Sequence, residues 1–277
     1  IGYKYYISEI TAPDKYYMTD ETFEFTYSYK DDSTYEYVFS HEFSNEEVRA
    51  EIHINKIDKE THDFISQGDA TLVGAEYGLF AAEDIEHPNK KSDPVYQKGD
   101  LVAKGKIGED GKLDFTDLYL GKYIVKELTP SEGYLLDPTE YPVDASYEGQ
   151  EVKIVHRDVT VHETVKKQPF QLIKVGSDGE QTEADLLESA GFKIYLISSL
   201  KGVQDGTIQP DENGNYSPEQ IRGYDFTEET SALDYSEDSN GVPMEEIFTD
   251  SKGYAQSKEL AYGKYVVIES TVPENYS

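Results

Sequence analysis

One phrase occurs three times in this chain, and it constrains the fold more than any other feature of the sequence. The copies lie at residues 4–16, 121–134 and 263–276. Each is an alternating apolar and polar stretch that ends in a glutamate, followed by a turn that contains a proline and closes with a tyrosine. The three glutamates, Glu9, Glu127 and Glu269, are 118 (127 − 9) and 142 (269 − 127) residues apart. These spacings have the size of a domain and predict a tandem array of similar domains, not a solenoid of small repeats.

The copies of the phrase divide the chain into three domains. Residues 1–48 are predicted to be the C-terminal part of one domain, and 49–165 a complete domain. Residues 166–277 are predicted to be a third domain that lacks its last strand. An insertion rich in Asp, Glu, Asn, Gly and Pro occupies 200–245 of this domain. We expect the native molecule to continue in both directions.

Short segments with a two-residue alternation fill most of the chain and predict β-strands. In the complete domain the expected strands are 51–58, 74–80, 101–107, 112–115, 122–127, 141–143 and 152–161. The first domain shows the pattern at 22–29 and 35–39, and the third at 170–175 and 189–195. Short helices are expected only at 219–224 or 227–233. Many short strands without a long helical period predict an all-β fold of tandem sandwich domains, joined in a rod.

The composition excludes several classes of function. With 25 Lys and Arg against 56 Asp and Glu, the net charge is −31, which argues against nucleic acids and anionic membranes as partners. So acidic a chain is often disordered, but the regular strand patterns favour a folded one. The absence of cysteine excludes disulfides, zinc–thiolate sites and thiol nucleophiles. No segment approaches the roughly 18 apolar residues of a membrane span.

Three local patterns resemble one known family. A first strand ending Lys56-Ile57-Asp58, the run Gly-Ala-Glu-Tyr-Gly-Leu-Phe at 74–80, and the glutamate phrase at 121–134 look like the Cna B-type, or SpaA-type, prealbumin-like domain. Such domains build pilins and adhesin stalks of Gram-positive bacteria. The resemblance covers essentially the whole chain and implies Ig-like (prealbumin-like) β-sandwiches. It also implies an extracellular place, in a pilus or anchored to the cell wall, with neighbouring domains or subunits of the same surface protein as partners.

The resemblance further implies a self-formed isopeptide bond. In many members a lysine on the first strand attacks an Asn or Asp side chain on the last strand, and a buried glutamate relays the protons. Burial keeps the lysine neutral and the glutamate protonated, and proximity removes most of the entropic barrier. Such a bond would make a cysteine-free chain resistant to force. It is a single-turnover reaction without a cofactor, so we do not expect an enzyme.

The family's glutamate corresponds to Glu9, Glu127 and Glu269. In the first domain the lysine strand is absent, and Asn45 stands where the acceptor would be. In the third domain Lys174 is the candidate lysine, and its acceptor would lie beyond residue 277.

In the complete domain the candidate lysine is Lys56, although some relatives carry the reactive lysine three residues earlier, where this chain has His53. The last strand has no asparagine, so Asp158 is the expected acceptor. The alternative is that Lys56 and Lys174 are solvated strand lysines and that the glutamates only cap turns or pair across the sheet. Even then Glu127 would need a partner, because a buried unpaired charge is costly.

Other candidate sites are weaker. His53 and His156 lie on the first and last strands of one domain and could face each other, but surface histidines on a sheet are the plainer interpretation. The acidic loops 211–215 and 234–241 offer oxygen ligands for calcium but lack the spacing of a calcium loop, so we predict no metal site. No catalytic triad or phosphate-binding loop is present.

Two functions remain open. The first is a structural stalk of a surface protein, as pilin backbone or adhesin. The second is a binding module whose acidic insertion, 200–245, contacts a host or matrix ligand. Deleting 200–245 should leave the stability of a stalk unchanged but abolish the affinity of a binder.

Overall fold

The computed structural model describes residues 2–91, 93–176, 186–231, 246–274 and 276. Contacts divide the chain into two compact units. Unit 1 contains residues 1–59, 73–130 and 136–163, and unit 2 contains 60–72, 131–135 and 164–277. The division into three domains stays a prediction. Among the described residues, no helix is long and apolar enough to cross a membrane.

Unit 1 contains a sandwich of two sheets, with strand orders β6-β3-β9 and β5-β4-β7-β8. The strands are β3 (Arg49–Asp58), β4 (Glu76–Ala81), β5 (Leu101–Lys106), β6 (Lys112–Leu118), β7 (Gly121–Thr129), β8 (Tyr141–Ala145) and β9 (Ile154–Glu163). Every second residue of β3 is buried, as the alternation predicts for a strand with one face on the core. All seven strands expected in this region are present.

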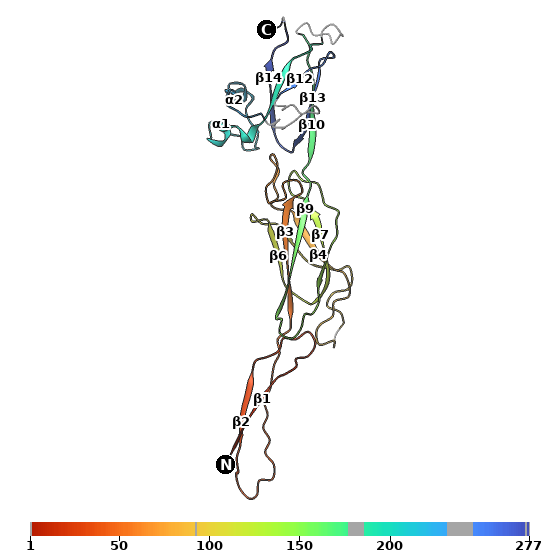
Figure 1. Ribbon diagram of the computed structural model, residues 1–277, viewed down its shortest axis with the longest axis vertical. Coiled ribbons are helices and arrows are strands. Elements are labelled where there is room, and N and C mark those ends of the chain that lie inside the picture. The colour runs from red at the N-terminus through yellow and green to blue at the C-terminus, as the bar shows by residue number, and fades with distance from the viewer. Residues whose placement is uncertain (1, 92, 177–185, 232–245, 275, 277) are drawn as a thin grey trace. The chain divides into compact units, whose positions relative to one another are not determined.

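The first and last strands of this sandwich are parallel neighbours. β9 pairs with β3 over ten residues, from Arg49 opposite Ile154 to Asp58 opposite Glu163. β6 pairs antiparallel with the other edge of β3. Figure 1 shows β3 and β9 side by side. A parallel neighbour needs a long connection, and here the rest of the sandwich supplies it.

The N-terminal part of unit 1 forms a two-stranded antiparallel sheet of β1 (Tyr3–Ser8) and β2 (Thr22–Tyr27). The prediction of a strand at 35–39 is wrong, because the backbone of this segment pairs with no other strand. It instead packs aromatic rings on β2, with Phe39 4.6 Å from Phe25 and Tyr37 4.8 Å from Tyr27, measured between ring centroids. The alternation of its rings reflects this contact.

Unit 2 has two small sheets, β10-β13 and β12-β11-β14. The strands are β10 (Lys167–Ile173), β11 (Gly191–Leu196), β12 (Ile247–Phe248), β13 (Tyr254–Ala261) and β14 (Tyr265–Thr271). Phe192, Ile194, Ile247 and Leu260 form the core between them. Among the described residues β10 pairs only with β13, whereas β3 of unit 1 is paired on both edges.

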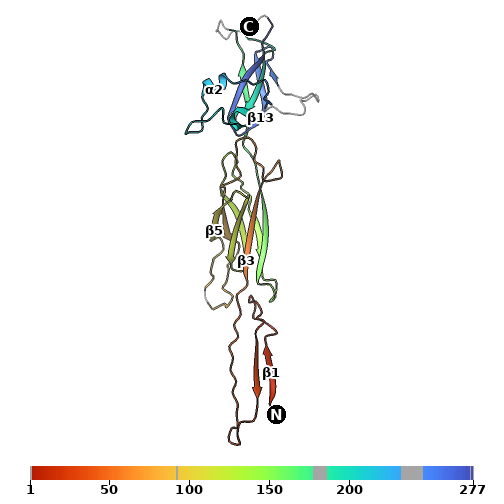
Figure 2. The same cartoon turned by 90° about the vertical axis from the view of Figure 1, so that its left-hand side faces the viewer.

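The described part of the insertion in unit 2, residues 200–231, is a folded cap and not a free acidic loop. A 3₁₀ turn (Ile197–Ser199) precedes it. The cap contains α1 (Lys201–Gln204) and α2 (Pro218–Arg222), which lie on one side of the unit in Figures 1 and 2. Ile208 and Ile221 are buried against Tyr195, and Val266 and Ile268 of β14 pack on the same cluster. Deleting 200–245 would expose this apolar face, so we now expect the deletion to lower the stability of a stalk as well.

The helix expectation is met in part. α2 overlaps the segment 219–224, and Ser217 caps its N-terminus by accepting a hydrogen bond from Gln220 N. Residues 227–231 form no helix, and 232–233 lie outside the described residues.

Candidate functional site

Three ionisable side chains meet inside the sandwich of unit 1. Lys56 of β3 lies with its Nζ 3.6 Å from Glu127 Oε1 of β7 and 3.6 Å from Glu163 Oε1 of β9. The side chains of Lys56 and Glu163 are fully buried, and that of Glu127 is 1% exposed. The cluster therefore joins both sheets of the sandwich and includes the first and last strands.

The backbone pattern explains how each residue reaches the cluster. Lys56 continues the buried set Ala50, Ile52 and Ile54 on β3, because alternate residues of a strand share one face. It faces Val161 in the parallel register, and Glu163 lies two residues farther along β9 on the same face.

Only some of the carboxylate oxygens are satisfied. The Asp137 N–H donates to Glu127 Oε2 at 2.7 Å, and the Tyr77 hydroxyl donates to Glu163 Oε1. Glu127 Oε1 and Glu163 Oε2 are buried without a hydrogen-bond partner among the described residues. Leaving a buried carboxylate oxygen unsatisfied is costly, so the ionised forms of both groups are disfavoured here.

Burial shifts the pKa of all three groups in the direction that favours their neutral forms. The pKa of Glu127 is raised to about 7, mainly by desolvation. The Asp137 N–H and Lys56 oppose this rise, and the nearby Glu163 carboxylate adds to it. Desolvation also raises the pKa of Glu163 and lowers that of Lys56. The site favours a neutral amine beside a neutral carboxylic acid, which is the pair of species that can condense to an amide.

Asp158, the expected acceptor, does not reach Lys56. It pairs with His53 in the register and is exposed, because its position on β9 has the opposite parity to Val161 and Glu163. The alternation of β9 contained this signal, since Val155, Val161 and Glu163 all have odd numbers. Glu163 was missed because the resemblance directed attention to Asn and Asp.

Glu9, the glutamate of the first copy, lies beside Asn45, the acceptor expected in the first domain. Asn45 Nδ2 donates to Glu9 Oε2 at 2.6 Å, and Thr19 N–H donates to the same oxygen at 3.0 Å. Thr19 follows Glu9 by ten residues, as Asp137 follows Glu127, so the turn after the strand provides a backbone donor in both copies. The two residues are half-buried.

The third copy also brings its pair together. Lys174 Nζ donates to Glu269 Oε2 at 2.8 Å. The side chains are 29% and 30% exposed, so solvent screens this pair far more than the cluster around Lys56.

The family model of the SpaA prealbumin-like fold domain matches the chain twice, over residues 50–160 and 168–277. The chain belongs to this family. The match confirms the resemblance seen in the sequence and the tandem β-sandwich fold class.

One solved structure with a TM-score above 0.5 supports the same fold, and pilin structures match with lower scores. The Bacillus anthracis TIE protein is similar over 98% of this chain and 37% of its own, with 20% identity and a TM-score of 0.55. A streptococcal ancillary pilin matches 99% of this chain and 68% of its own, with 19% identity and a TM-score of 0.31. The group B streptococcus pilus 2b backbone protein matches over 57% of this chain and 52% of its own, with 17% identity and a TM-score of 0.33. No curated protein sequence matches the chain.

The acidic loop at 211–215 is held by a lysine within this SpaA-type unit. Asp211 Oδ1 accepts hydrogen bonds from the backbone of Asn213 and Asn215, and Lys264 Nζ lies 3.3 Å from Asn215 Oδ1 and donates to Gly214 O. The ammonium group of Lys264 thus already contacts oxygen atoms of this loop that a calcium ion would need. The second acidic loop, 234–241, lies outside the described residues.

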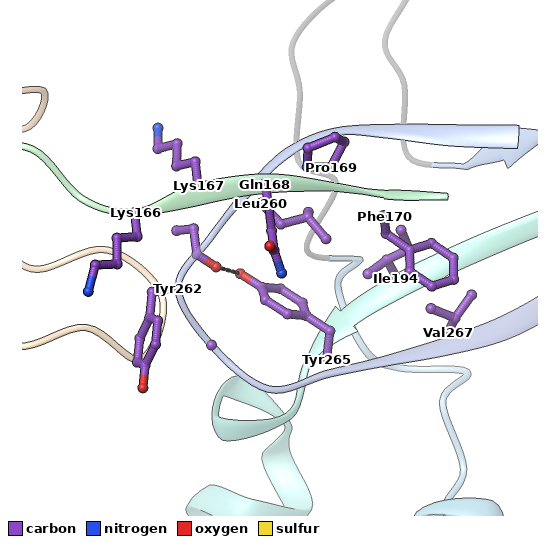
Figure 3. A pocket seen from close by; sticks show the side chains of 12 residues that line it. Lys166, Lys167, Gln168, Pro169, Phe170, Ile194, Leu260, Tyr262, Tyr265 and Val267 are labelled. Atoms are coloured by element: carbon purple, nitrogen blue, oxygen red, sulfur yellow. Dashed lines mark hydrogen bonds between the residues drawn. The ribbon is translucent and has the colours of Figure 1, made fainter. Parts of the chain in front are cut away.

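A pocket of about 450 Å³ lies in unit 2 beside β10 (Figure 3). Phe170, Ile194, Leu260 and Val267 form its apolar side, and Tyr265 donates to Ala261 O at its edge. The labelled lysines, Lys166 and Lys167, extend away from this apolar side in Figure 3. The pocket holds no cluster of titratable groups comparable to that around Lys56.

Proposed function

We propose that this chain is a load-bearing segment of a Gram-positive pilus or surface stalk. Its partners would be neighbouring domains or subunits of the same surface protein, outside the cell. The observation that carries the proposal is the burial of Lys56 between Glu127 and Glu163, because these side chains connect the two strands at which the chain enters and leaves the sandwich.

The parallel pairing of β3 and β9 suits such a role. The chain enters this region at Arg49 and leaves it at Glu163, at opposite ends of the shared ladder. Tension on the two ends therefore loads the ladder in shear, so that many hydrogen bonds resist together. A bond between Lys56 and Glu163 would shorten the loaded path to a few residues of β3 and the link itself.

The chemistry of the cluster favours a covalent link. The neutral Lys56 amine would attack Glu163 Cδ, forming a C–N bond as the C–OH bond breaks and one water leaves. Glu127 would carry the proton from nitrogen to the departing oxygen. Lys56 Nζ lies 3.6 Å from Glu163 Oε1 in the buried cluster. Holding the amine beside the carboxyl group in this way gives an intramolecular reaction its advantage of proximity.

Charge balance supports the same step. An ionised cluster would hold one cation and two carboxylates in an apolar interior, with two carboxylate oxygens unsatisfied. Amide formation removes the cation and one carboxylate together. The remaining Glu127 can stay protonated and donate to the new amide carbonyl.

The intact mass of the denatured chain tests the proposal. We expect the sequence mass minus one water. Glu163→Gln should lose one ammonia instead of one water, so its final mass should equal that of the wild type. Lys56→Met and Glu163→Ala should each show their full sequence mass. A wild-type mass equal to the sequence mass would overturn the covalent link and leave an ionic cluster.

Force spectroscopy tests the mechanical role separately. An unlinked domain of residues 49–163 would extend to a length of roughly 390 Å when pulled open, at about 3.4 Å per residue. The linked domain should show no step of that size, whereas Lys56→Met should show it. A full-length step from a chain that has lost one water would refute the load path, though not the bond.

A further inference from the structure

The outer face of the β3–β9 pair carries a second cluster, away from Lys56. Glu51 and His53 are alternate residues of β3 and share this face. The parallel register places His156 of β9 opposite Glu51, and β6 contributes Asp114 opposite His53. Three strands thus bring two imidazoles and two carboxylates together on one side of the sheet.

The donor atoms are close enough to share one ion. Glu51 Oε2 lies 3.3 Å from His156 Nδ1 and 3.8 Å from His53 Nε2. One donor atom of each of the three residues lies within 4.8 Å of the others, and the imidazole rings stack at 5.8 Å between centroids. A tetrahedral zinc site places its donors about 3.3 Å apart, so only small side-chain movements are needed.

Asp114 prepares His53 for this role. Its Oδ1 lies 2.7 Å from His53 Nδ1, which makes Nδ1 the donor and leaves the lone pair of Nε2 toward Glu51. A carboxylate that fixes the tautomer of a histidine in this way is a common support of metal-binding imidazoles.

The charges around the cluster also favour a cation. The chain carries a net charge of −31, and Asp158 is a further exposed carboxylate opposite His53. The basic side chains at the start of the two strands pair with other acids, Arg49 with Glu47 at 2.9 Å and Lys153 with Glu46 at 2.5 Å.

We infer that Glu51, His53 and His156 bind a divalent transition metal ion of the Zn²⁺ class. Imidazole nitrogens are ligands of borderline metals, whereas Mg²⁺ and Ca²⁺ prefer sets made of oxygen ligands alone, so two imidazoles with one carboxylate favour the borderline class. Three protein ligands leave a position for water. The ion would join β3 to β9 near the start of both strands, at the other end of the ladder from Lys56 and Glu163.

Isothermal titration of the untagged full chain with ZnCl₂ tests this site. The chain is first freed of metal with a chelator, and excess Mg²⁺ occupies weak acidic sites. We expect one Zn²⁺ per chain. His156→Ala should weaken binding at least tenfold, and Asp114→Asn by about 10–100-fold. The matched control is His162→Ala, which removes an exposed histidine from the same strand and should change nothing.

The imidazole signals in NMR spectra give a second readout. Zn²⁺ should shift the resonances of His53 and His156 together and saturably, and leave those of His162 in place. Because His156 is 58% exposed at the side chain, its substitution should not disturb folding. The inference is overturned if His156→Ala binds Zn²⁺ as tightly as the wild type, or if His162→Ala weakens binding equally.

Discussion

Replacing Glu127 by Gln distinguishes a covalent link from an ionic cluster around Lys56, because the two alternatives predict opposite changes in the stability of the domain. Gln is nearly isosteric with Glu and can still accept the hydrogen bond that Asp137 N–H gives to Glu127. It cannot relay a proton. If Lys56 and Glu163 form an amide, the substitution should prevent the bond.

The size of the loss follows from the loop that the bond closes. Lys56 and Glu163 enclose about 107 residues, and closing a loop of that length restricts the unfolded chain by about 4.8 kcal/mol at 25 °C. A domain of about 110 residues unfolds with an entropy near 0.23 kcal/mol/K, so the melting temperature should fall by about 20 °C.

The ionic alternative predicts the opposite direction. A cluster of one lysine and two glutamates has an excess negative charge, and burial disfavours it. Removing the charge of Glu127 should then leave stability unchanged or increase it. Calorimetry of the full chain, with the intact mass measured on the same samples, distinguishes the two. Glu140→Gln, at an exposed residue paired with Lys126, is the control. A variant that melts at or above the wild-type temperature would refute the covalent reasoning.

Three further predictions concern the same residues and the cap. Because burial raises the pKa of Glu127 to about 7 from its ordinary 4.5, the folded chain binds more protons between these values, so stability should fall by up to about 3 kcal/mol as pH rises from 4.5 to 7. Urea titrations across this range should show a fall that Glu127→Gln lacks. Tyr77→Phe removes the hydroxyl that donates to the Glu163 carboxyl and should lower the free energy of unfolding by about 1–3 kcal/mol in the same assay. An unchanged free energy would contradict a stabilising role for this hydrogen bond. Ile208→Ala in the cap should cost about 2–5 kcal/mol, against almost none for the exposed Ile10→Ala, and equal effects would contradict a packed cap.

The two-residue alternation was sufficient to predict the sandwich strands of unit 1, and the resemblance of three short motifs, at 56–58, 74–80 and 121–134, predicted the family. Both signals are local, and each strand of the sandwich has one face on the core. The wrong strand prediction at 35–39 shows the limit of this reasoning. Alternation indicates that one face of a segment is covered, but it does not say whether a backbone strand or side chains cover it. Phe39 meets the ring of Phe25 instead of a backbone ladder.

The site was predicted only in part for a related reason. Lys56 and Glu127 follow from motifs, but their third partner depends on register, which a motif does not contain. Asp158 and Glu163 differ in parity along β9, and parity decides which of them is buried. The cap of unit 2 was missed because its apolar residues, such as Ile208 and Ile221, are widely spaced among acidic ones.

The parallel pairing of β3 and β9 also has a consequence for the order of folding. Arg49 finds its partner only at Ile154, so roughly a hundred residues must follow β3 before that edge can close. A chain that emerges N-terminus first therefore leaves one backbone edge of β3 unpaired until β9 has been made. The polar side chains that alternate along β3, Glu51 and His53 among them, lie beside that open edge and would discourage its pairing with another copy during this interval.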